Sequence, residues 1–346
     1  MAVTILKTGI QCSVQDLGRY GFQRYGVPVS GAMDKHAAAV ANLLVGNRKE
    51  LAVLEFVLHG AVIRFNNNAL IAFSGSGAVP VSDLQNLDLQ NPNLQGRGFG
   101  GRERTTQLPV HKAIYVPKNT IVELQYSDKG CRMYMAVAGG IDVPVVMGSR
   151  SAYLPAGAGE MIAAGGSLEV GAISDVSINM LRSLTGDLVG IAKWGAIELI
   201  EEAGSDYIRF LRGAEWEQFN KVSQNNWLND WFTISNASDR MGIKLEGGQL
   251  SRATSREMIS TAVTAGTVQV IPDGSPLILM ADAQTTGGYP RIAQIIDADL
   301  PILAQKRPGD KIRFRAVSPL VAEELYINTQ EELKRLERNI KTKFSI

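Results

Sequence analysis

Along most of this chain, apolar and polar residues alternate with the period of two that is typical of β-strands. The alternation is clearest in residues 120–126 and 311–316, where one set of alternate positions is mainly apolar and the other mainly polar. Further strand-like runs are residues 3–6, 61–65, 69–74, 113–116, 132–137, 194–202, 207–211 and 277–280, with two short pieces in 258–270. The pattern predicts a mainly β protein with a few helices.

Two segments change to the helical period. The first is alanine-rich, with Asp34 as a plausible N-cap and Gly46 as its C-terminal stop. Its periodic positions are Met33, Ala37, Val40, Ala41 and Leu44. The second begins after Ser318 and is highly charged, with a narrow apolar stripe of Leu333, Leu336 and Ile340. This stripe predicts a docked C-terminal helix rather than a partner-binding one.

Turn signals divide the chain. Three asparagines, residues 66–68, lie between two strand-like runs and predict a hairpin turn. A polar stretch near residues 172–190 separates two strand-rich halves of similar length. We therefore place the first domain at residues 1–178, the second at 179–318 and a helical tail at 319–346.

Composition narrows the class of protein. A chain of 346 residues is long enough for two domains, and its 45% hydrophobic and 20% charged residues are those of a globular protein. A net charge of +1 gives no reason to expect nucleic acid or an anionic membrane as a partner. No 18-residue apolar run occurs, and the start MAVTILKTGIQ lacks the basic and apolar regions of a signal peptide. We expect a cytoplasmic protein.

The metal-ligating and nucleophilic residue types do not form a familiar site. Cys12 and Cys131 lie far apart with no CxxC pattern. His36, His59 and His111 are scattered, with no HxH or HExxH. We therefore predict no metal site.

Two glycine-rich segments invite an anion-binding interpretation. Residues 74–77 (SGSG) follow a strand but lack GxGxxG and GK[ST], and Pro80 interrupts any following helix, so a plain turn is favoured. The basic loop at residues 96–102 (GRGFGGR) could clamp an anion, but a surface insertion is favoured.

Four motifs carry denser polar chemistry. The first, residues 15–47, is a glycine-punctuated loop with Asp16, Arg19, Ser30 and Asp34, closed by the alanine-rich helix. A polar loop on a packed helix is a common way to present functional groups on a rigid support.

The second motif joins AVAGGIDVP at residues 136–144 to MGSRS at 147–151. Its paired glycines allow close approach of two backbones, and Arg150 with Ser149 could hold an anionic group. A turn that packs the two halves together explains the glycines equally well. The third, SDRMGIKLEG at 238–247, would by itself be a solvated turn.

The fourth motif, ADAQTTGGYPR at residues 281–291, follows a wholly apolar strand. Folding has no evident need for so many hydroxyl, amide and charged groups, which favours a functional site. Asp282 could act as a base or a metal ligand, and Arg291 could bind a carboxylate through two hydrogen bonds. Thr285, Thr286 and the glycine amides could bind an oxyanion or phosphate.

These four motifs, in this order, resemble those of the carboxyltransferase-domain family. That family includes the C subunit of the prokaryotic 5-oxoprolinase, the carboxyltransferase part of urea carboxylase (urea amidolyase), and the antagonist of a sporulation-kinase inhibitor. The resemblance implies two tandem cyclophilin-like β-barrel domains and a place in a larger assembly, whose other members are the cyclophilin-like B subunit of 5-oxoprolinase and its A subunit. It implies ATP-dependent opening of 5-oxoproline to L-glutamate, with ATP and Mg²⁺ held by this chain or by a partner.

The resemblance also assigns the site. Catalytic roles fall to Asp282, Asp34 and Arg291. Substrate or phosphate binding falls to Asp16, Arg19, Ser30, Asn42, Arg150, Arg240, Gln284, Thr285, Thr286, Gly287, Gly288 and Tyr289. The first and fourth motifs would then face each other and form one composite site.

Two departures from the family pattern keep alternatives open. Residues 156–166 lack the expected arginine and have Gly166 where aspartate is usual, and residues 212–215 (RGAE) replace Pro-Gly-Pro. One alternative is a biotin-dependent carboxyltransferase subunit that acts on urea or a similar small amide. The other is a non-catalytic regulator that binds a kinase-inhibitor-like partner.

Overall fold

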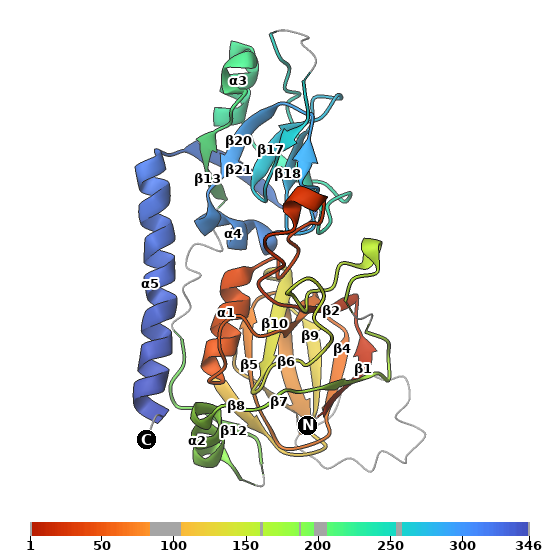
Figure 1. The fold of residues 1–346 in the computed structure, drawn as a ribbon, viewed down its shortest axis with the longest axis vertical. Coiled ribbons are helices and arrows are strands. Elements are labelled where there is room, and N and C mark those ends of the chain that lie inside the picture. The colour runs from red at the N-terminus through yellow and green to blue at the C-terminus, as the bar shows by residue number, and fades with distance from the viewer. Residues whose placement is uncertain are drawn as a thin grey trace. The chain divides into compact units, whose positions relative to one another are not determined.

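The computed structural model divides the chain into two compact units, each built from segments that are distant in sequence (Figure 1). The first unit comprises Met1–Leu17, Lys35–Leu199 and Leu333–Ile346, and the second comprises Gly18–Asp34 and Ile200–Glu332. The structure describes residues 2–83, 105–159, 162–186, 188–196, 206–253 and 258–344. The boundaries after residues 178 and 318 stay a prediction. They divide the chain into continuous domains, whereas each compact unit combines separate segments.

In the described part of the first unit, the strands form two six-stranded sheets that enclose one apolar core. One sheet has the order β11-β1-β4-β9-β6-β7. Its strands are β1 (Ala2–Thr8), β4 (Ala61–Phe65), β6 (Ala78–Asp83), β7 (Thr105–Gln107), β9 (Ile121–Tyr126) and β11 (Ser167–Glu169). The other has the order β12-β8-β5-β10-β3-β2. Its strands are β2 (Gln11–Gln15), β3 (Val53–Val57), β5 (Ala69–Gly75), β8 (Ala113–Val116), β10 (Arg132–Val137) and β12 (Gly190–Ile191).

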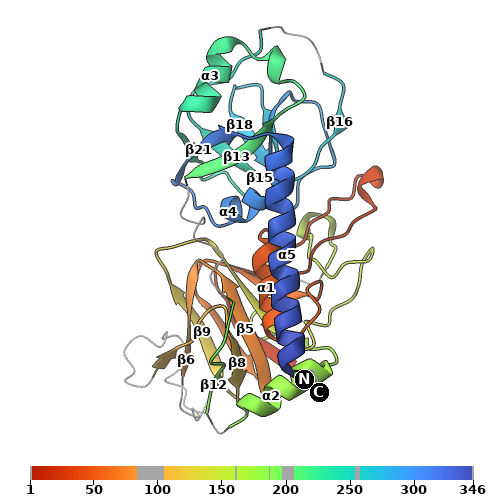
Figure 2. The same ribbon diagram turned by 90° about the vertical axis from the view of Figure 1, so that its left-hand side faces the viewer.

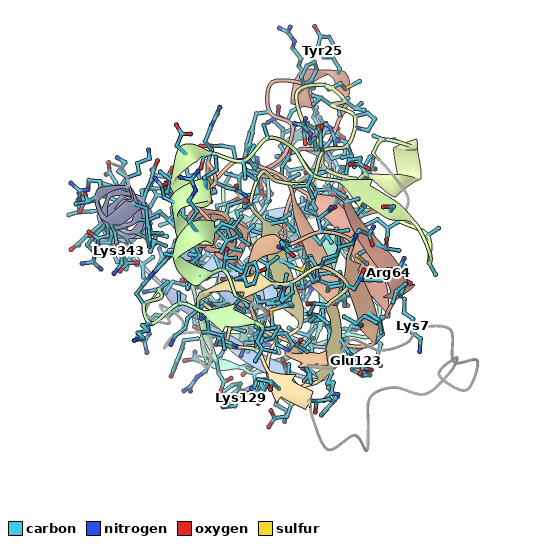
Figure 3. All side chains as sticks on the ribbon, turned by 90° about the horizontal axis from the view of Figure 1, so that it is seen from below. Lys7, Tyr25, Arg64, Glu123, Lys129 and Lys343 are labelled. Carbon is cyan, nitrogen blue, oxygen red and sulfur yellow. The ribbon has the colours of Figure 1, made fainter. Side chains whose placement is uncertain are left out.

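The outer face of the first sheet is charged. Lys7 on β1 and Glu123 on β9 both lie opposite Val62 on β4, and Arg64 is two residues further along β4. Figure 3 shows these three charged side chains at the edge of the molecule. Alternation of this kind, with apolar positions turned to the core, is why the strand prediction from periodicity succeeds here.

The asparagines 66–68 do not form the predicted hairpin. β4 pairs with β1 and β9, whereas β5 pairs with β8 and β10, so the turn carries the chain from one sheet to the other. Both strands are almost wholly buried. Two such strands bury more apolar surface when they lie in two sheets packed face to face than when they pair in one sheet. The local turn signal does not show which of these two arrangements forms.

Three helices accompany the first unit's sheets. α1 (Lys35–Leu44) begins directly after Asp34, as predicted, and ends near Gly46, which adopts the left-handed conformation. The polar stretch at 172–190 contains helix α2 (Asp175–Leu184), which the sequence pattern did not predict; its N-cap Ser174 accepts a hydrogen bond from the Ser177 amide. The segment reads as polar because this helix buries only two side chains, those of Ser177 and Met180.

The C-terminal helix is confirmed as α5 (Pro319–Phe344), with Leu333 and Ile340 buried. Its last residues dock against α2 and the chain before residue 197 (Figure 2). Asn179 donates to the Phe344 carbonyl at 3.0 Å, and the rings of Trp194 and Phe344 lie 5.5 Å apart.

In the second unit, seven strands among the described residues close into a barrel. Parallel pairing of β13 with β21 completes the ring β13-β20-β17-β18-β15-β14-β21. The strands are β13 (Tyr207–Arg212), β14 (Phe232–Ile234), β15 (Gly242–Glu246), β17 (Thr267–Val270), β18 (Pro276–Leu279), β20 (Arg291–Ile295) and β21 (Lys311–Ala316). The mainly β fold with a closed barrel and a C-terminal helix is therefore confirmed.

Helix α3 (Lys221–Asn229) contributes the aromatic centre of this unit's core. Its Trp227 stacks on Phe314 of β21 with ring centroids 3.8 Å apart. The remaining described elements are α4 (Leu300–Ala304), the two-stranded β16 (Thr261–Ala262) and β19 (Thr286–Gly287), and the 3-10 turns η1 (Gln23–Tyr25), η3 (Leu154–Ala156), η4 (Trp216–Gln218) and η5 (Asp297–Asp299).

Two predictions lie wholly or largely outside the described residues: the basic loop at 96–102 and the strand at 194–202. Within the part that is described, no helix has the length and apolar character needed to span a membrane.

Candidate functional site

The third and fourth motifs meet in the second unit through a buried ion pair. Nε of Arg240 lies 2.8 Å from Oδ2 of Asp282, and Nη2 lies 3.1 Å from Oδ1. The side chains are 10% and 8% exposed. Such a two-point contact is the strong form of an arginine–carboxylate pair. The solvated-turn interpretation of Arg240 is therefore wrong.

The local sequence explains why Arg240 points inward. Oδ1 of Asp239 accepts hydrogen bonds from the amides of Met241 and Gly242, which makes a tight turn before β15. The Asp282 amide then donates to the Arg240 carbonyl at 2.9 Å. The two loops are thus joined through both backbone and side chains.

The first motif also contacts Arg240 and the start of the fourth motif. The Gly31 carbonyl accepts a 2.6 Å hydrogen bond from Nη2 of Arg240, and the Ser30 amide donates to the Ala281 carbonyl at 2.9 Å. Ser30 has a positive φ of 55°, which is uncommon for a residue other than glycine. Its hydroxyl is fully buried and has no hydrogen-bond partner among the described atoms. The loop is therefore held in a constrained conformation against Arg240.

Two further first-motif residues are buried in the same unit. Oδ2 of Asp34 accepts a hydrogen bond from Nε2 of Gln305 at 3.0 Å, and Asp34 is 2% exposed. Arg19 is 1% exposed, and its amide donates to the Val29 carbonyl at 2.7 Å. Because Ser30, Asp34 and Arg19 are all enclosed, this geometry suits them to shape the loop rather than to touch a ligand.

The segment from Gln284 to Tyr289 is the accessible part of the fourth motif. Gln284, Thr286 and Tyr289 are exposed, whereas Thr285, Gly287 and Gly288 are half-buried. Thr286 and Gly287 pair with β16 as the short strand β19. The side-chain amide of Gln284 donates to Oε1 of Gln269 at 3.4 Å. This loop, which follows Asp282 directly in the chain, therefore presents hydroxyl and amide groups to solvent.

The guanidinium of Arg291 is bound to a carboxylate of this chain instead of being available to a ligand. Its Nε and Nη2 bind the two carboxylate oxygens of Glu215 at 2.8 and 2.7 Å, and its amide donates to the same group at 2.9 Å. Gly213 makes this approach possible, since a Cβ there would lie 2.2 Å from the Arg291 carbonyl. The carboxylate partner expected for Arg291 is thus found within the chain, at a departure from the family pattern.

This contact changes the acidity of both groups. Burial raises the pKa of Glu215, but the hydrogen bonds and charge of Arg291 outweigh it, so the pKa of the carboxyl lies below its ordinary value. The hydrogen bonds that Arg291 donates to Glu215, opposed by burial, raise the pKa of Arg291. Both groups are charged at neutral pH, which suits a structural clamp.

Asp16 belongs to the first unit, where it joins the second motif. Its carboxylate accepts hydrogen bonds from Oγ of Ser149 at 2.7 Å, Oγ of Ser151 at 2.5 Å and the Arg150 amide at 2.6 Å. The Asp16 amide in turn donates to Oγ of Ser151 at 2.9 Å. The MGSRS sequence therefore folds around Asp16, and Asp16 is 9% exposed.

Arg150 and Asn42 have separate tasks in the first unit. The Arg150 guanidinium donates to the Val143 carbonyl at 2.9 Å and to Asp142 at 2.7 Å, with a third of its side chain exposed. Asn42 is fully buried, donates to the Leu51 carbonyl and accepts from Asn47. Its side chain therefore supports the end of α1.

The paired glycines of the second motif are explained by packing. Gly139 has φ of +100°, and a Cβ there would lie 2.3 Å from the Gly171 carbonyl oxygen. Two backbone segments can approach this closely only without a side chain. Likewise, Gly77 lies against the Cys131 backbone, so the SGSG segment is a turn between β5 and β6.

The described residues include no group of three or more His, Cys, Asp or Glu side chains that could hold a metal ion. The structure thus brings Ser30, Gly31, Arg240 and Asp282 together, and separately brings Asp16 to Ser149–Ser151. It gives Arg291 a different partner.

Three partners of the candidate residues are not predicted from the sequence: Glu215, Ser151 and Gln305. Glu215 lies in a departure from the family pattern and Ser151 lies in a motif, so both carry a signal. Gln305 follows α4 at 271 residues from Asp34, and nothing local marks it.

Comparison with known proteins agrees with this architecture. The family model described as "Carboxyltransferase domain, subdomain A and B" matches residues 25–316. The C subunit of the 5-oxoprolinase of Escherichia coli (strain K12) is 37% identical over 311 residues, which are 90% of this chain and 89% of that protein. The C subunit of the Haemophilus influenzae 5-oxoprolinase is 33% identical over 344 residues, which are 99% of each.

A solved structure supports the same grouping. The crystal structure of the Kluyveromyces lactis urea carboxylase matches with a TM-score of 0.79 at 25% identity, covering 98% of this chain but only 29% of that one. The resemblance drawn from the four motifs is therefore confirmed over nearly the whole length, and this chain belongs to the family of carboxyltransferase domains with subdomains A and B.

Proposed function

We propose that this chain is the C subunit of an ATP-dependent 5-oxoprolinase, which opens 5-oxoproline to L-glutamate together with its A and B subunits. The observation that carries the proposal is the 33% identity to a 5-oxoprolinase C subunit over 99% of both chains. Relatives named urea amidolyase are more distant, at 26% identity, and this chain spans only 17% of the yeast protein.

The chemistry explains why such an enzyme uses ATP. A γ-lactam is an unactivated amide, and phosphorylation of its oxygen turns that oxygen into part of a leaving group. Water then adds to the ring carbon that bears the phosphorylated oxygen, and the C–N bond breaks to leave a free amine and an acyl phosphate. A second water hydrolyses the acyl phosphate, so that 5-oxoproline, ATP and two waters give glutamate, ADP and phosphate. Catalysis requires hydrogen-bond donors where negative charge develops on the oxygen.

Within this chain, the fourth-motif loop is the best source of such donors. We assign substrate contact to Gln284, Thr285 and Thr286, whose polar groups are accessible. Asp282 and Arg240 position that loop, because both carboxylate oxygens of Asp282 are already taken by the guanidinium. A base role for Asp282 would require this pair to open.

The SGSG segment does not fit a phosphate-binding loop. It is a tight turn leading into a strand, and a phosphate loop instead wraps backbone amides around phosphate before a helix. We therefore assign ATP and its Mg²⁺ to a partner chain. The proposed partners are the B subunit, which is cyclophilin-like, together with the A subunit.

The carboxyltransferase alternative has one observation in its favour, the structural match to a urea carboxylase. It would require biotin and carrier segments from other chains. The absence of the expected arginine in residues 156–166 counts against it. The regulatory alternative predicts binding to a partner with no turnover.

Reconstitution tests these functions directly. The purified A and B subunits are combined with this chain, and ATP-dependent glutamate release from 5-oxoproline is measured. We expect activity only with all three, and about a tenfold loss of kcat/KM for Thr286→Val, as one transition-state hydrogen bond is removed. Thr342→Val, an exposed threonine on α5, serves as the matched control. Full activity without this chain would refute the catalytic role.

A further inference from the structure

The first unit contains a pocket that the proposed function does not use. Its volume is about 470 Å³, within the range typical of small-molecule sites. The lining residues come from segments within 46–52, 139–150 and 171–174, all in the first unit. The pocket thus lies where the exit of α1, the turn after β10 and the entry of α2 converge.

The walls of this pocket are rigid. The side chain of Asn47 donates to the Val137 carbonyl at 2.8 Å and accepts from the Gly139 amide at 2.8 Å. The Gly171 amide donates to the Gly140 carbonyl at 3.0 Å. Backbone segments fixed in this way create a preformed cavity rather than one that a ligand must open.

One guanidinium is fixed at the pocket. Two hydrogen bonds, to the Val143 carbonyl and to Asp142, hold Arg150 in place while a third of its side chain stays exposed. A second, Arg48, is 82% exposed at the lining and lies 3.6 Å from the Glu50 carboxylate. A carboxylate entering the pocket would therefore meet a preorganised cation and a mobile one.

The pocket also offers an acceptor and an apolar wall. Asp142 is half exposed, and only its Oδ1 is engaged by Arg150 among the interactions of the described residues. Leu51, Ile141 and Ile173 supply apolar surface. A purely anionic ligand such as phosphate would be repelled by Asp142 and would leave the apolar wall unused, whereas a compact organic molecule with both an acid and an N–H group satisfies all three features.

We propose that this pocket binds a small carboxylic acid that also carries an N–H donor, as an amino acid or its lactam does. The carboxylate pairs with Arg150 and Arg48, the N–H donates to Asp142, and the carbon chain lies on the apolar wall. The site is separate in sequence from the fourth-motif loop, and the choice of 5-oxoproline and L-glutamate as its ligands rests on the proposed function.

Calorimetric titration of the full chain tests the proposal. The probes are L-glutamate, 5-oxoproline, glutarate (which lacks the amine) and inorganic phosphate. We expect saturable 1:1 binding of L-glutamate or 5-oxoproline, weakened about tenfold or more by Arg150→Gln, since a charged hydrogen-bond pair is lost. Arg182→Gln, an exposed arginine on α2 outside the pocket, should leave binding unchanged.

Asp142→Asn separates the two ligand sources. It should weaken L-glutamate, whose ammonium needs the charge, more than 5-oxoproline, and should not weaken glutarate. Arg48→Gln, at an exposed position, provides a second variant if Arg150→Gln unfolds the chain. Three results would overturn the proposal. The first is that neither L-glutamate nor 5-oxoproline binds saturably, and the second is that the Arg150 and Arg48 variants bind them as tightly as the wild type does. The third is that phosphate binds as tightly as these acids. Because binding and not turnover is measured, failure of this proposal can be distinguished from failure of the 5-oxoprolinase test.

Discussion

Removing Arg240 should destabilise the second unit severely. Arg240→Leu deletes three hydrogen bonds, two to Asp282 and one to the Gly31 carbonyl, and leaves a carboxylate that is only 8% exposed without its counter-charge. Breaking a buried ion pair from one side costs about 3–5 kcal/mol. The cost arises mainly from the abandoned charge rather than from the lost contact.

The double substitution separates these two contributions. With Asp282→Leu added, both members of the ion pair are gone, and the Gly31 carbonyl loses its donor, at about 1–2 kcal/mol. The double variant should therefore be more stable than Arg240→Leu alone. Arg212→Leu is the matched control, because its pair with Glu217 is 4.0 Å long and both side chains are more than 60% exposed, so it should cost under about 1 kcal/mol.

Urea unfolding followed by tryptophan fluorescence measures the effect. Three of the four tryptophans, Trp216, Trp227 and Trp231, lie in the second unit, so the signal reports mainly on it. Two results would refute the reasoning. One is a loss below about 1 kcal/mol for Arg240→Leu, and the other is a double variant less stable than the single one.

Three further predictions follow from individual contacts. The pKa of Glu215 is held below its ordinary value, so the stability it contributes is present at neutral pH and is lost as pH falls through the folded-state pKa. Unfolding free energies of wild type and Glu215→Gln should accordingly converge as the pH falls below the ordinary pKa of a glutamate, and a constant difference would contradict the role of the Arg291 contact. Asp16→Ala leaves two hydroxyls and an amide without their acceptor and should lower stability by about 2–4 kcal/mol, with Asp16→Asn losing less, as measured by urea unfolding. Burial, and secondarily a nearby carboxylate, raises the pKa of the Cys12 thiol. In a Cys131→Ser background, Ellman's reagent at pH 8 should therefore label Cys12 more slowly in the native chain than after unfolding, and equal rates would disprove this.

Local periodicity is enough to predict the elements that have one apolar face. β9, β21 and α1 follow their patterns closely, and the stripe of α5 correctly identifies Leu333 and Ile340 as buried. In each case the pattern reports burial directly, because a side chain's environment is repeated along the element. The asparagine turn gives a wrong prediction and helix α2 is missed, because their local signals are compatible with more than one tertiary arrangement.

Pairing between distant residues is not accessible in the same way. Arg240 and Asp282 are 42 residues apart, Glu215 and Arg291 are 76 apart, and nothing in the local sequence links them. The motifs indicate which segments are rich in polar residues, but they do not indicate which acidic residue pairs with which basic residue. That is why the sequence predicts a ligand carboxylate for Arg291, whereas the structure gives it a carboxylate from its own unit.

The composition of the two units leads to a prediction about truncation. A fragment of residues 179–318 would lack Ser30 and Gly31, which pair with Ala281 and Arg240, and would lack Asp34, the partner of Gln305.

A fragment of residues 1–178 would likewise lack Asn179, Trp194 and the end of α5 that docks on them in the first unit. We expect each fragment alone to be insoluble or to lack a cooperative unfolding transition, because each leaves buried groups without their partners.

A matched pair of longer fragments tests this expectation. Residues 200–332 with the 18–34 segment attached through a flexible linker should recover a cooperative transition, since that fragment restores the second unit as the structure composes it. The same fragment with Ser30 and Gly31 replaced by a linker of equal length should not. Cooperative unfolding of the bare 179–318 fragment would show instead that the first motif contributes little to the barrel, and would favour the boundary drawn from sequence composition.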